Sequence, residues 1–283
     1  MSIDELKSQY KLQSEIFWIT QREIIETFTR YIFPVNQPVA IILGGQPGSG
    51  KSELIGKAQI LLKNNAVVCN ADLYREFHPD YEEIITYHEG DYPEITAKVA
   101  QDWNDGLRAH CEQHQLNFIM ETTFSSGERM NQTLHDIKAA GYVVYIMLMA
   151  VPAKISLLCT YLRYEDSKRT TGKGRLVERH IHDEKYARVA DTLQLVQAAN
   201  LFDHLLIYYR ATENATQIEK RDKILLLAEN PPDPLTVYLN ERDKPWDSHS
   251  RSYFKNNCNN VIRMMKERNA GEDAIELFKI NLK

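Results

Sequence analysis

Cysteine is scarce in this sequence, and the cysteines that occur are far apart. The chain of 283 residues has four, Cys69, Cys111, Cys159 and Cys258, and none of them forms a C-x-x-C pair. Zinc ribbons need paired ligands at short spacing, and disulfide-stabilised secreted domains need a higher density of cysteine. Neither class is therefore supported, and a reducing compartment fits the composition.

Long apolar runs are also absent. The longest, 142–151, has ten residues and ends before Pro152, so it is too short to cross a bilayer. The N-terminal stretch MSIDELKSQYKLQSEIFWITQ is charged throughout and lacks the basic start and apolar run of a secretory signal. We therefore expect a cytoplasmic protein that does not enter a membrane.

An excess of positive charge is missing as well. Lysine and arginine number 34 against 39 acidic residues, which gives a net charge of −5. A long nucleic acid is therefore an unfavoured partner, although a local basic patch remains open. Apolar residues make up 43% of the chain, which is enough for a large globular core.

Short apolar runs alternate with helical patterns along most of the chain. Strands are expected at 39–45, 66–70, 116–122, 142–150 and 204–209. Helices are expected between them at 53–64, 93–115, 128–140, 153–166 and 176–200, and a polar loop after the second strand. Strands that alternate with helices form βαβ units. We therefore predict an α/β fold of three layers, with a central, mainly parallel sheet between helices.

Both ends of the chain look helical. Apolar residues recur at helical spacing through 4–32 and again through 254–282. Prolines at 34 and 38 follow the first pattern, and the sequence PPDP at 231–234 precedes the second. We expect an N-terminal helical extension over 1–35, the α/β domain over 36–230 and a C-terminal helical extension over 231–283.

The strongest motif follows the first expected strand. It matches G-x-x-x-x-G-K-[ST] in full and consists of Gly45, Gln46, Pro47, Gly48, Ser49, Gly50, Lys51 and Ser52. Glycines let successive backbone N–H groups point at phosphate oxygens, and the following helix directs its positive end at them. We expect Lys51 to reach the β and γ phosphates and Ser52 to offer its hydroxyl to Mg²⁺. The motif predicts a P-loop, kinase-like domain that binds ATP and Mg²⁺, and does not identify the reaction.

Two carboxylates follow the next two strands. Asp72 comes after the second strand and Glu121 ends the third, and ligands of open α/β sheets bind just beyond such strand ends. Asp72 is a candidate general base for an acceptor hydroxyl, or alternatively a helix cap. Glu121 is a candidate to hold a substrate hydroxyl or a metal-bound water, or alternatively part of a helix start.

Basic residues gather in 163–179, where RYEDSKRTTGKGRLVER has six basic and three acidic side chains. We expect a glycine-containing loop between two helices that closes over ATP as a lid. A solvated polar loop is the alternative. The following HIHD looks like a metal cluster, but His180 and His182 point to different sides of a helix, which disfavours shared ligation.

Together these segments resemble the zeta toxin family, the toxin half of bacterial epsilon/zeta toxin–antitoxin pairs. The resemblance covers roughly residues 36–210. The P-loop is common to many families, whereas the D-x-[YF]-[RK]-x-x-H-P block after it is far more specific. The segments that carry the resemblance are LGGQPGSGKS (43–52), NADLYREFHPDY (70–81), IMETTF (119–124), MAVPA (149–153), RYED (163–166) and Arg175 with the following His182-Asp183.

The resemblance implies a kinase that moves the γ-phosphate of ATP onto the 3′-hydroxyl of the amino sugar of UDP-N-acetylglucosamine, which would block cell-wall synthesis. By position, Lys51 matches the family's P-loop lysine and Asp72 its general base. Arg163 and Arg175 match the arginines that clamp the triphosphate. The positions that match substrate contacts are Glu121, Thr123, Thr133 and, more weakly, Asp105.

The resemblance also implies a partner, because a helical antitoxin blocks the ATP site in this family. Either terminal extension here is a candidate to dock such a partner or to inhibit in cis. One segment departs from the family, since TTFSS at 122–126 replaces a glycine-rich sequence. The alternatives are a P-loop kinase of another small acceptor, such as a nucleotide, NAD or an antibiotic, and a non-catalytic ATP-dependent switch.

Overall fold

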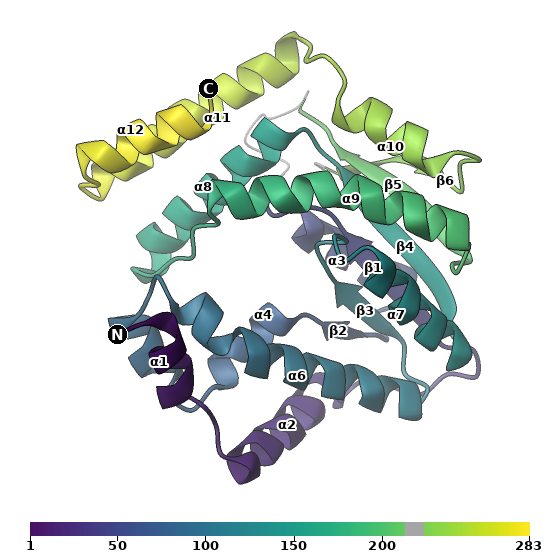
Figure 1. The fold of residues 1–283 in the computed structure, drawn as a ribbon. Coiled ribbons are helices and arrows are strands. Elements are labelled where there is room, and N and C mark those ends of the chain that lie inside the picture. Colours follow the sequence, from purple (N-terminus) through teal and green to yellow (C-terminus); the bar gives the residue numbers. More distant parts are fainter. Residues whose placement is uncertain (213–223) are drawn as a thin grey trace.

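The computed structural model describes residues 1–212 and 224–283, and within them a six-stranded sheet forms the centre of the molecule (Figure 1). The strand order is β2-β3-β1-β4-β5-β6. The strands are β1 (Val39–Gly44), β2 (Val67–Cys69), β3 (Phe118–Glu121), β4 (Val143–Ala150), β5 (His204–Arg210) and β6 (Ile224–Glu229). Strands β1 to β5 pair in parallel, and β6 pairs with β5 in the antiparallel direction. The predicted α/β fold with a mainly parallel sheet is confirmed.

Helices cover both faces of this sheet. One face packs against α2 (Ser14–Thr29), α6 (Tyr92–Gln113), α7 (Glu128–Ala139), α9 (Arg179–Ala199) and α10 (Pro234–Arg242). The other packs against α3 (Lys51–Leu61), α8 (Ala153–Thr171) and α11 (Ser248–Glu267). The remaining helical segments are α1 (Ile3–Gln9), α4 (Ala71–Tyr74), the 3₁₀ turn η1 (Arg75–Phe77), α5 (Tyr81–Tyr87) and α12 (Glu272–Asn281). In the described part of the chain, no helix combines the length and apolarity needed to cross a bilayer.

The central strand β1 shows why these layers form. Ala40 and Ile42 pack on the side of α2 and α6, and Ile41 and Leu43 pack on the side of α3 and α8. All four are fully buried, because successive side chains of a strand point to opposite faces and both faces here are covered. The continuous apolar run that marked this strand in the sequence therefore reflects burial on two sides.

The strand order also decides which chain segments meet at the carboxyl edge of the sheet. β3 lies between β2 and β1, so the ends of these three strands are neighbours. The P-loop follows β1, Asp72 follows β2, and Glu121 is the last residue of β3. This places all three segments at one edge, as an open α/β sheet requires for a ligand site.

The N-terminal helices are part of the core. Figure 1 shows α1 and α2 beside α6. Ile24 of α2 is fully buried, and Leu6 of α1 is nearly so. Trp103 of α6 donates its indole N–H to the carbonyl of Phe17 at 3.2 Å. The division at residue 35 stays a prediction. In the structure, α2 shares its hydrophobic cluster with the sheet.

The C-terminal helices α11 and α12 lie along α8 (Figure 1). Their shared cluster includes Leu158, Val261 and Phe278. The helical structure expected over 254–282 is present and is divided into two helices, because α11 ends at Glu267 and α12 begins at Glu272. Asn269 between them has φ +58°, a left-handed conformation that ends a helix.

Helical structure extends further than expected in two other places. The segment 163–179, which was expected to be a lid loop, is mostly helix, because α8 continues to Thr171. Gly172 caps the end of this helix with a φ of +74°, a left-handed conformation that glycine adopts readily. The loop proper is 172–178. The polar stretch after β2 is not a loop either but contains α4, η1 and α5. Strand β6 was not expected. Its three leucines, Leu225, Leu226 and Leu227, follow one another without alternating with polar residues, and all three are exposed at the sheet edge.

Candidate functional site

The P-loop adopts the conformation that its glycines predict. It leaves β1 at Gly44 and enters α3 at Lys51. Gly48 has φ +75°, and a Cβ built there would lie 2.0 Å from the backbone oxygen of Ser156. Only glycine fits this position, because any side chain would collide with the start of α8. The P-loop is therefore packed directly against α8.

Two side chains of the motif hold the P-loop in place. Gln46 is fully buried and donates its amide to the carbonyl of Val151 at 2.8 Å and to Ser156 Oγ at 3.1 Å. Lys51 Nζ donates to the carbonyl of Gly45 at 2.7 Å. Burial lowers the pKa of Lys51 to about 8, although the carboxylates of Glu121 and Asp72 oppose this shift. The lysine thus lies at the base of the loop, where an anion would restore its ordinary pKa.

The buried link from Gln46 continues beyond α8. Ser156 Oγ and His182 Nε2 are 2.8 Å apart, and His182 Nδ1 lies 2.9 Å from Asp183 Oδ1. Burial lowers the pKa of His182 despite this carboxylate. His182 therefore connects the P-loop to α9 and is fully buried, whereas His180 is exposed. The two histidines point apart, as the helix geometry predicted.

A cavity of about 990 Å³ opens above the P-loop. Its volume is at the upper end of the range for small-molecule sites. Most of the predicted site residues line it, namely Pro47, Gly48, Gly50, Lys51, Ser52, Asp72, Asp105, Glu121, Thr123, Thr133, Arg163 and Arg175. The other three, Gly45, Gln46 and Ser49, are buried beneath it. Residues from seven separate segments of the chain thus converge on one space.

Asp72 lies in the first turn of α4, which Asn70 caps by accepting from the Asp72 N–H at 2.9 Å. Two guanidinium groups bind the same carboxylate oxygen, Oδ1. Arg75 Nε donates to it at 2.8 Å and Arg175 Nη1 at 2.9 Å. Partial desolvation raises the pKa of Asp72, but Arg175 and Arg75 outweigh it and hold the pKa below its usual value. Asp72 is therefore an ionised, oriented carboxylate in the cavity wall.

Glu121 differs from Asp72 in its charge environment. It accepts from the side-chain amide of Asn70 at 2.7 Å, so one asparagine connects the segments that carry both carboxylates. Burial raises the pKa of Glu121, Lys51 lowers it in part, and the charge of Asp72 raises it further. The cavity thus places two carboxyl groups with oppositely shifted pKa values near one lysine.

The remaining predicted substrate residues line the same cavity. Thr123 Oγ1 lies 2.7 Å from Ser125 Oγ, and Thr133 Oγ1 donates to the carbonyl of Arg129 at 2.9 Å. Asp105 Oδ1 accepts from the Gln101 amide at 3.0 Å. These hydroxyl and carboxylate groups suit a polar ligand.

Basic side chains dominate the cavity wall. Four acids line it, Glu53, Asp72, Asp105 and Glu121, against seven basic residues, Lys51, Arg75, Arg108, Arg129, Arg163, Arg175 and Arg210. Phosphate groups are the ligands that guanidinium groups bind best. The cavity therefore fits a polyanion, although the whole chain is net acidic.

Arg210 is a site residue that the sequence reasoning missed. It ends β5, and its side chain is 9% exposed. A Cβ built on Gly50 would lie 2.5 Å from Arg210 Nη2, so the guanidinium packs against the P-loop. Tyr253 and Asn257 of α11 line the same wall. The available signal was position, since Arg210 ends a strand at the edge that carries the P-loop.

The donor set at the start of α3 suits a magnesium–nucleotide complex. Ser52 is exposed and lines the cavity. Among the residues described, no group of three or more His, Cys, Asp and Glu side chains is arranged to hold a metal alone. Mg²⁺ commonly keeps water and phosphate oxygens and takes few protein ligands, so a single hydroxyl fits that role.

The fold and this site define a P-loop protein of the kinase-like class. The chain belongs to the zeta toxin family, because the family model described as zeta toxin matches residues 23–230. The resemblance found in the sequence is confirmed.

Curated relatives are similar over much of the chain. Toxin zeta of Streptococcus agalactiae is 26% identical over 190 residues, which cover 66% of this chain and 65% of that protein. Toxin PezT of Streptococcus pneumoniae serotype 4 is 27% identical over 187 residues, which cover 66% of this chain and 74% of that protein. The similarity therefore spans slightly less than two thirds of the length of the first of these relatives.

Solved structures share the fold. A chain from the PezAT chromosomal toxin–antitoxin system of Streptococcus pneumoniae has a TM-score of 0.76 at 22% identity, covering 89% of this chain and 98% of that one. A chain of the AvrRxo1-ORF1:-ORF2 structure with ATP has a TM-score of 0.51 at 13% identity, covering 80% of this chain and 64% of that one. The predicted P-loop kinase-like architecture is confirmed.

Proposed function

We propose that this protein is a kinase that transfers the γ-phosphate of ATP to the 3′-hydroxyl of the amino sugar of UDP-N-acetylglucosamine. The observation that carries the proposal is the juxtaposition of Lys51, Ser52 and an ionised Asp72 around one cavity. A protein that only binds ATP needs a P-loop but no carboxylate to activate a hydroxyl.

The positions of these groups support the following transfer. The acceptor oxygen bonds to the γ-phosphorus, the bond from that phosphorus to the bridging oxygen of ADP breaks, and the hydroxyl proton passes to Asp72. Arg75 and Arg175 both bind Oδ1 of Asp72, and no hydrogen bond from the described residues reaches Oδ2. We assign Oδ2 as the atom that accepts the proton. Catalysis then consists of positioning and charge stabilisation, as is usual for phosphoryl transfer.

The basic side chains stabilise the charge of the transferring group. Lys51 binds the β and γ phosphates from the base of the P-loop, and Arg163 and Arg175 bind from α8 and the loop after it. Ser52 would hold Mg²⁺, which when bound supplies positive charge to the same phosphates.

Glu121, Thr123, Thr133 and Asp105 are proposed to bind the acceptor. They line the same cavity as Asp72, and the resemblance found in the sequence assigns them to the family's substrate contacts. The excess of arginine in the cavity wall suits the diphosphate of a nucleotide sugar. A toxin role, an antitoxin partner and a cytoplasmic location are proposed on the same relationship, since one fold neighbour comes from a toxin–antitoxin system.

Labelled ATP and a panel of acceptors test the proposal. We expect label on UDP-N-acetylglucosamine and a loss of transfer of about 10²-fold or more for Asp72→Asn, because the general base is removed. Asp166→Asn is the matched control, since Asp166 is an exposed carboxylate that pairs with Arg169 on α8.

The alternatives give different results. Transfer to a nucleotide, NAD or an antibiotic, with none to UDP-sugars, would identify a kinase of another acceptor. Tight ATP binding without transfer to any acceptor would identify a non-catalytic switch.

A further inference from the structure

The segment 172–178 between α8 and α9, which we name the lid segment, carries Arg175 to Asp72. It begins at Gly172, whose N–H donates to the carbonyl of Lys168 at 3.0 Å and so closes the last turn of α8. Thr171 Oγ1 donates to the carbonyl of Lys173 at 3.0 Å. These local bonds shape the turn but do not by themselves fix where Arg175 lies relative to the opposite wall of the cavity.

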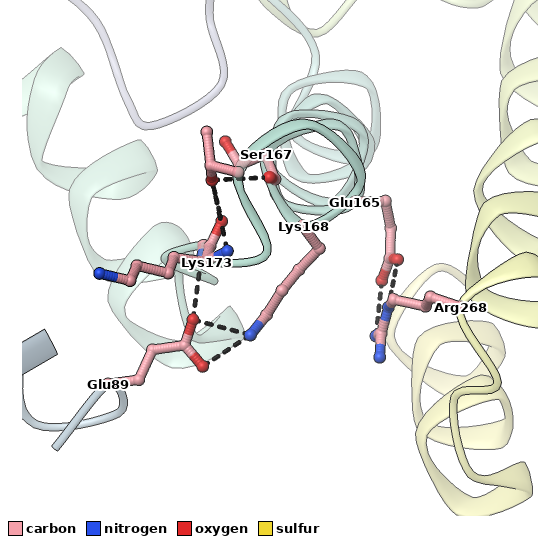
Figure 2. A network of polar contacts seen from close by, with 8 residues as sticks. Glu89, Glu165, Ser167, Lys168, Lys173 and Arg268 are labelled. Carbon is pink, nitrogen blue, oxygen red and sulfur yellow. Dashed lines mark hydrogen bonds and ion pairs between the residues drawn. The ribbon is translucent and has the colours of Figure 1, made fainter. Parts of the chain in front are cut away.

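Three acidic side chains from the segments between β2 and α6 bind this region. Asp72 pairs with Arg175 at 2.9 Å, and Glu82 of α5 pairs with Lys173 at 2.9 Å. The third, Glu89, lies between α5 and α6 and makes more contacts than either. Figure 2 shows its carboxylate between Lys168 and the backbone next to Lys173.

Glu89 binds both sides of the α8 terminus. Its Oε1 and Oε2 accept from Lys168 Nζ at 2.7 and 2.6 Å, and Oε1 also accepts from the N–H of Gly174 at 2.9 Å. Gly174 directly precedes Arg175, so this bond fixes the backbone next to the guanidinium that reaches Asp72. A charged acceptor for a backbone N–H is stronger than a neutral one.

The Glu89–Lys168 pair is more buried than the neighbouring Glu82–Lys173 pair. The side chains of Glu89 and Lys168 are 34% and 16% exposed, whereas those of Glu82 and Lys173 are 81% and 38% exposed. Partial desolvation raises the pKa of Glu89, but Lys168 and the Gly174 N–H outweigh it and lower the pKa. Exposed ion pairs contribute little, so the Glu82 pair is a weak restraint beside the Glu89 contacts.

We propose that Glu89 is a positioning residue that fixes the lid segment across the cavity and thereby holds Arg175 at the catalytic carboxylate. The lid segment in turn connects the wall that carries Asp72 to the wall that carries Arg163. The effect on transfer rests on the proposed kinase function, whereas the effect on the lid segment does not.

Hydrogen exchange tests the structural part without any assumption about the reaction. In Glu89→Ala we expect the Gly174 amide to exchange about tenfold faster, because its charged acceptor is gone. Glu89→Gln keeps one acceptor oxygen and should give an intermediate rate. Lys168→Met removes the ion pair from the other side and should also speed exchange. Glu82→Gln is the matched control and should leave the amide unchanged.

A double-mutant cycle tests whether Glu89 acts through Arg175. We expect Glu89→Ala to lower kcat about tenfold with a smaller change in KM for ATP, and to lower it less than twofold in an Arg175→Ala background. Glu82→Gln should retain the wild-type kcat.

The possible results distinguish a failure of the role proposed for Glu89 from a failure of the proposed kinase function. Unchanged Gly174 exchange in both Glu89→Ala and Lys168→Met would overturn the proposal, as would full additivity with Arg175→Ala. Faster exchange in a protein that transfers phosphate to no acceptor would refute the proposed kinase function while retaining the role of Glu89 in fixing the lid segment.

Discussion

Asp72 and Glu121 are carboxylates of the same cavity whose pKa values move apart. Two arginines stabilise the charge of Asp72, whereas burial disfavours the charge of Glu121. As pH falls from neutrality, Glu121 therefore takes up a proton before Asp72 does. Pairs of groups separated in this way commonly divide acid–base roles.

The order of protonation predicts the acidic limb of the pH profile. In the wild type, we expect kcat/KM to fall on the acidic side with an apparent pKa that belongs to Glu121. Glu121→Gln should lower the plateau about tenfold and flatten that limb, since Asp72 stays ionised over the range. Steady-state kinetics between pH 5 and pH 8, at roughly half-unit steps, measure the plateau of kcat/KM and its fall on the acidic side. An unchanged acidic limb in the variant would assign it to another group.

The lowered pKa of Lys51 leads to a second prediction about pH, again at the scale of one residue. Its pKa is lowered to about 8, so near that pH the free protein holds only about half a proton on Nζ. Binding of the ATP phosphates restores the ammonium, so nucleotide binding should take up about half a proton near pH 8 and almost none near pH 6.5. Calorimetry in buffers of different ionisation enthalpy measures this uptake.

Two variants complete the test of Lys51. Lys51→Met should bind ATP without proton uptake, and Lys57→Met, on the same helix but outside the cavity lining, should behave as the wild type. The lowered pKa of Lys51 also determines whether stability rises or falls with pH. Because the unfolded chain binds this proton more tightly, Lys51 makes the free energy of unfolding rise with pH between about 8 and 10.5.

At the scale of elements, α8 organises the site. Its N-terminal turn packs against Gly48, its middle carries Arg163, and its last turn leads into the lid segment. On its outer side, α11 is attached by an ion pair in which Arg268 donates to both oxygens of Glu165, at 2.6 and 2.9 Å (Figure 2). Glu165 is 1% exposed, and Arg268 supplies a hydrogen bond to each oxygen of this buried carboxylate.

This burial predicts a large effect for the loss of Arg268. Arg268→Ala should lower the free energy of unfolding by about 2–3 kcal/mol, because it leaves an unpaired buried carboxylate. Arg263→Ala is the matched control, since Arg263 pairs with Glu267 on the exposed side of α11, and should change it by about 0.5 kcal/mol or less. Urea unfolding measures both, and equal losses would argue against a structural role for the buried pair.

At the scale of the whole molecule, the terminal helices are built into the fold. His78, within the block that the sequence singled out, lies 3.1 Å from the carbonyl of Tyr10 through Nε2. That block therefore serves the packing of α1 as well as the site. By contrast, α1 and α2 contribute no residue to the cavity wall, whereas α11 contributes Tyr253 and Asn257.

The packing of α2 predicts that the N-terminal segment is structural. Ile24→Ala should lower the free energy of unfolding by about 3 kcal/mol, because Ile24 is fully buried. Ile19→Ala, in the same helix but 47% exposed, should cost about 0.5 kcal/mol or less. Removal of residues 1–32 should then abolish cooperative thermal unfolding. A truncated protein that folds and transfers phosphate faster would instead support inhibition in cis.

Local patterns predicted the elements whose signal lies within one segment. Neighbouring residues were enough to predict the P-loop, the strands β1 and β4, and the start of α3. The need for glycine and burial on two faces both produce recognisable patterns within a short stretch of sequence. Arg210 and Glu89 belong to no local motif, because each contacts a segment far away in the chain, and only the position of Arg210 at a strand end was a signal. The extent of α8 was missed because six basic residues suggested a loop, whereas helix continues until a residue ends it.

The amino-acid sequence by itself determined the phosphate-binding loop, the alternation of strands and helices and the family, because each depends on residues close together in the chain. Only the tertiary structure decided which charges share the cavity and how they are paired. Strand order brings Asp72 beside Glu121, and packing of α8 brings Arg175 across to Asp72. Such contacts depend on how distant segments bury their apolar faces together, and no local pattern specifies them.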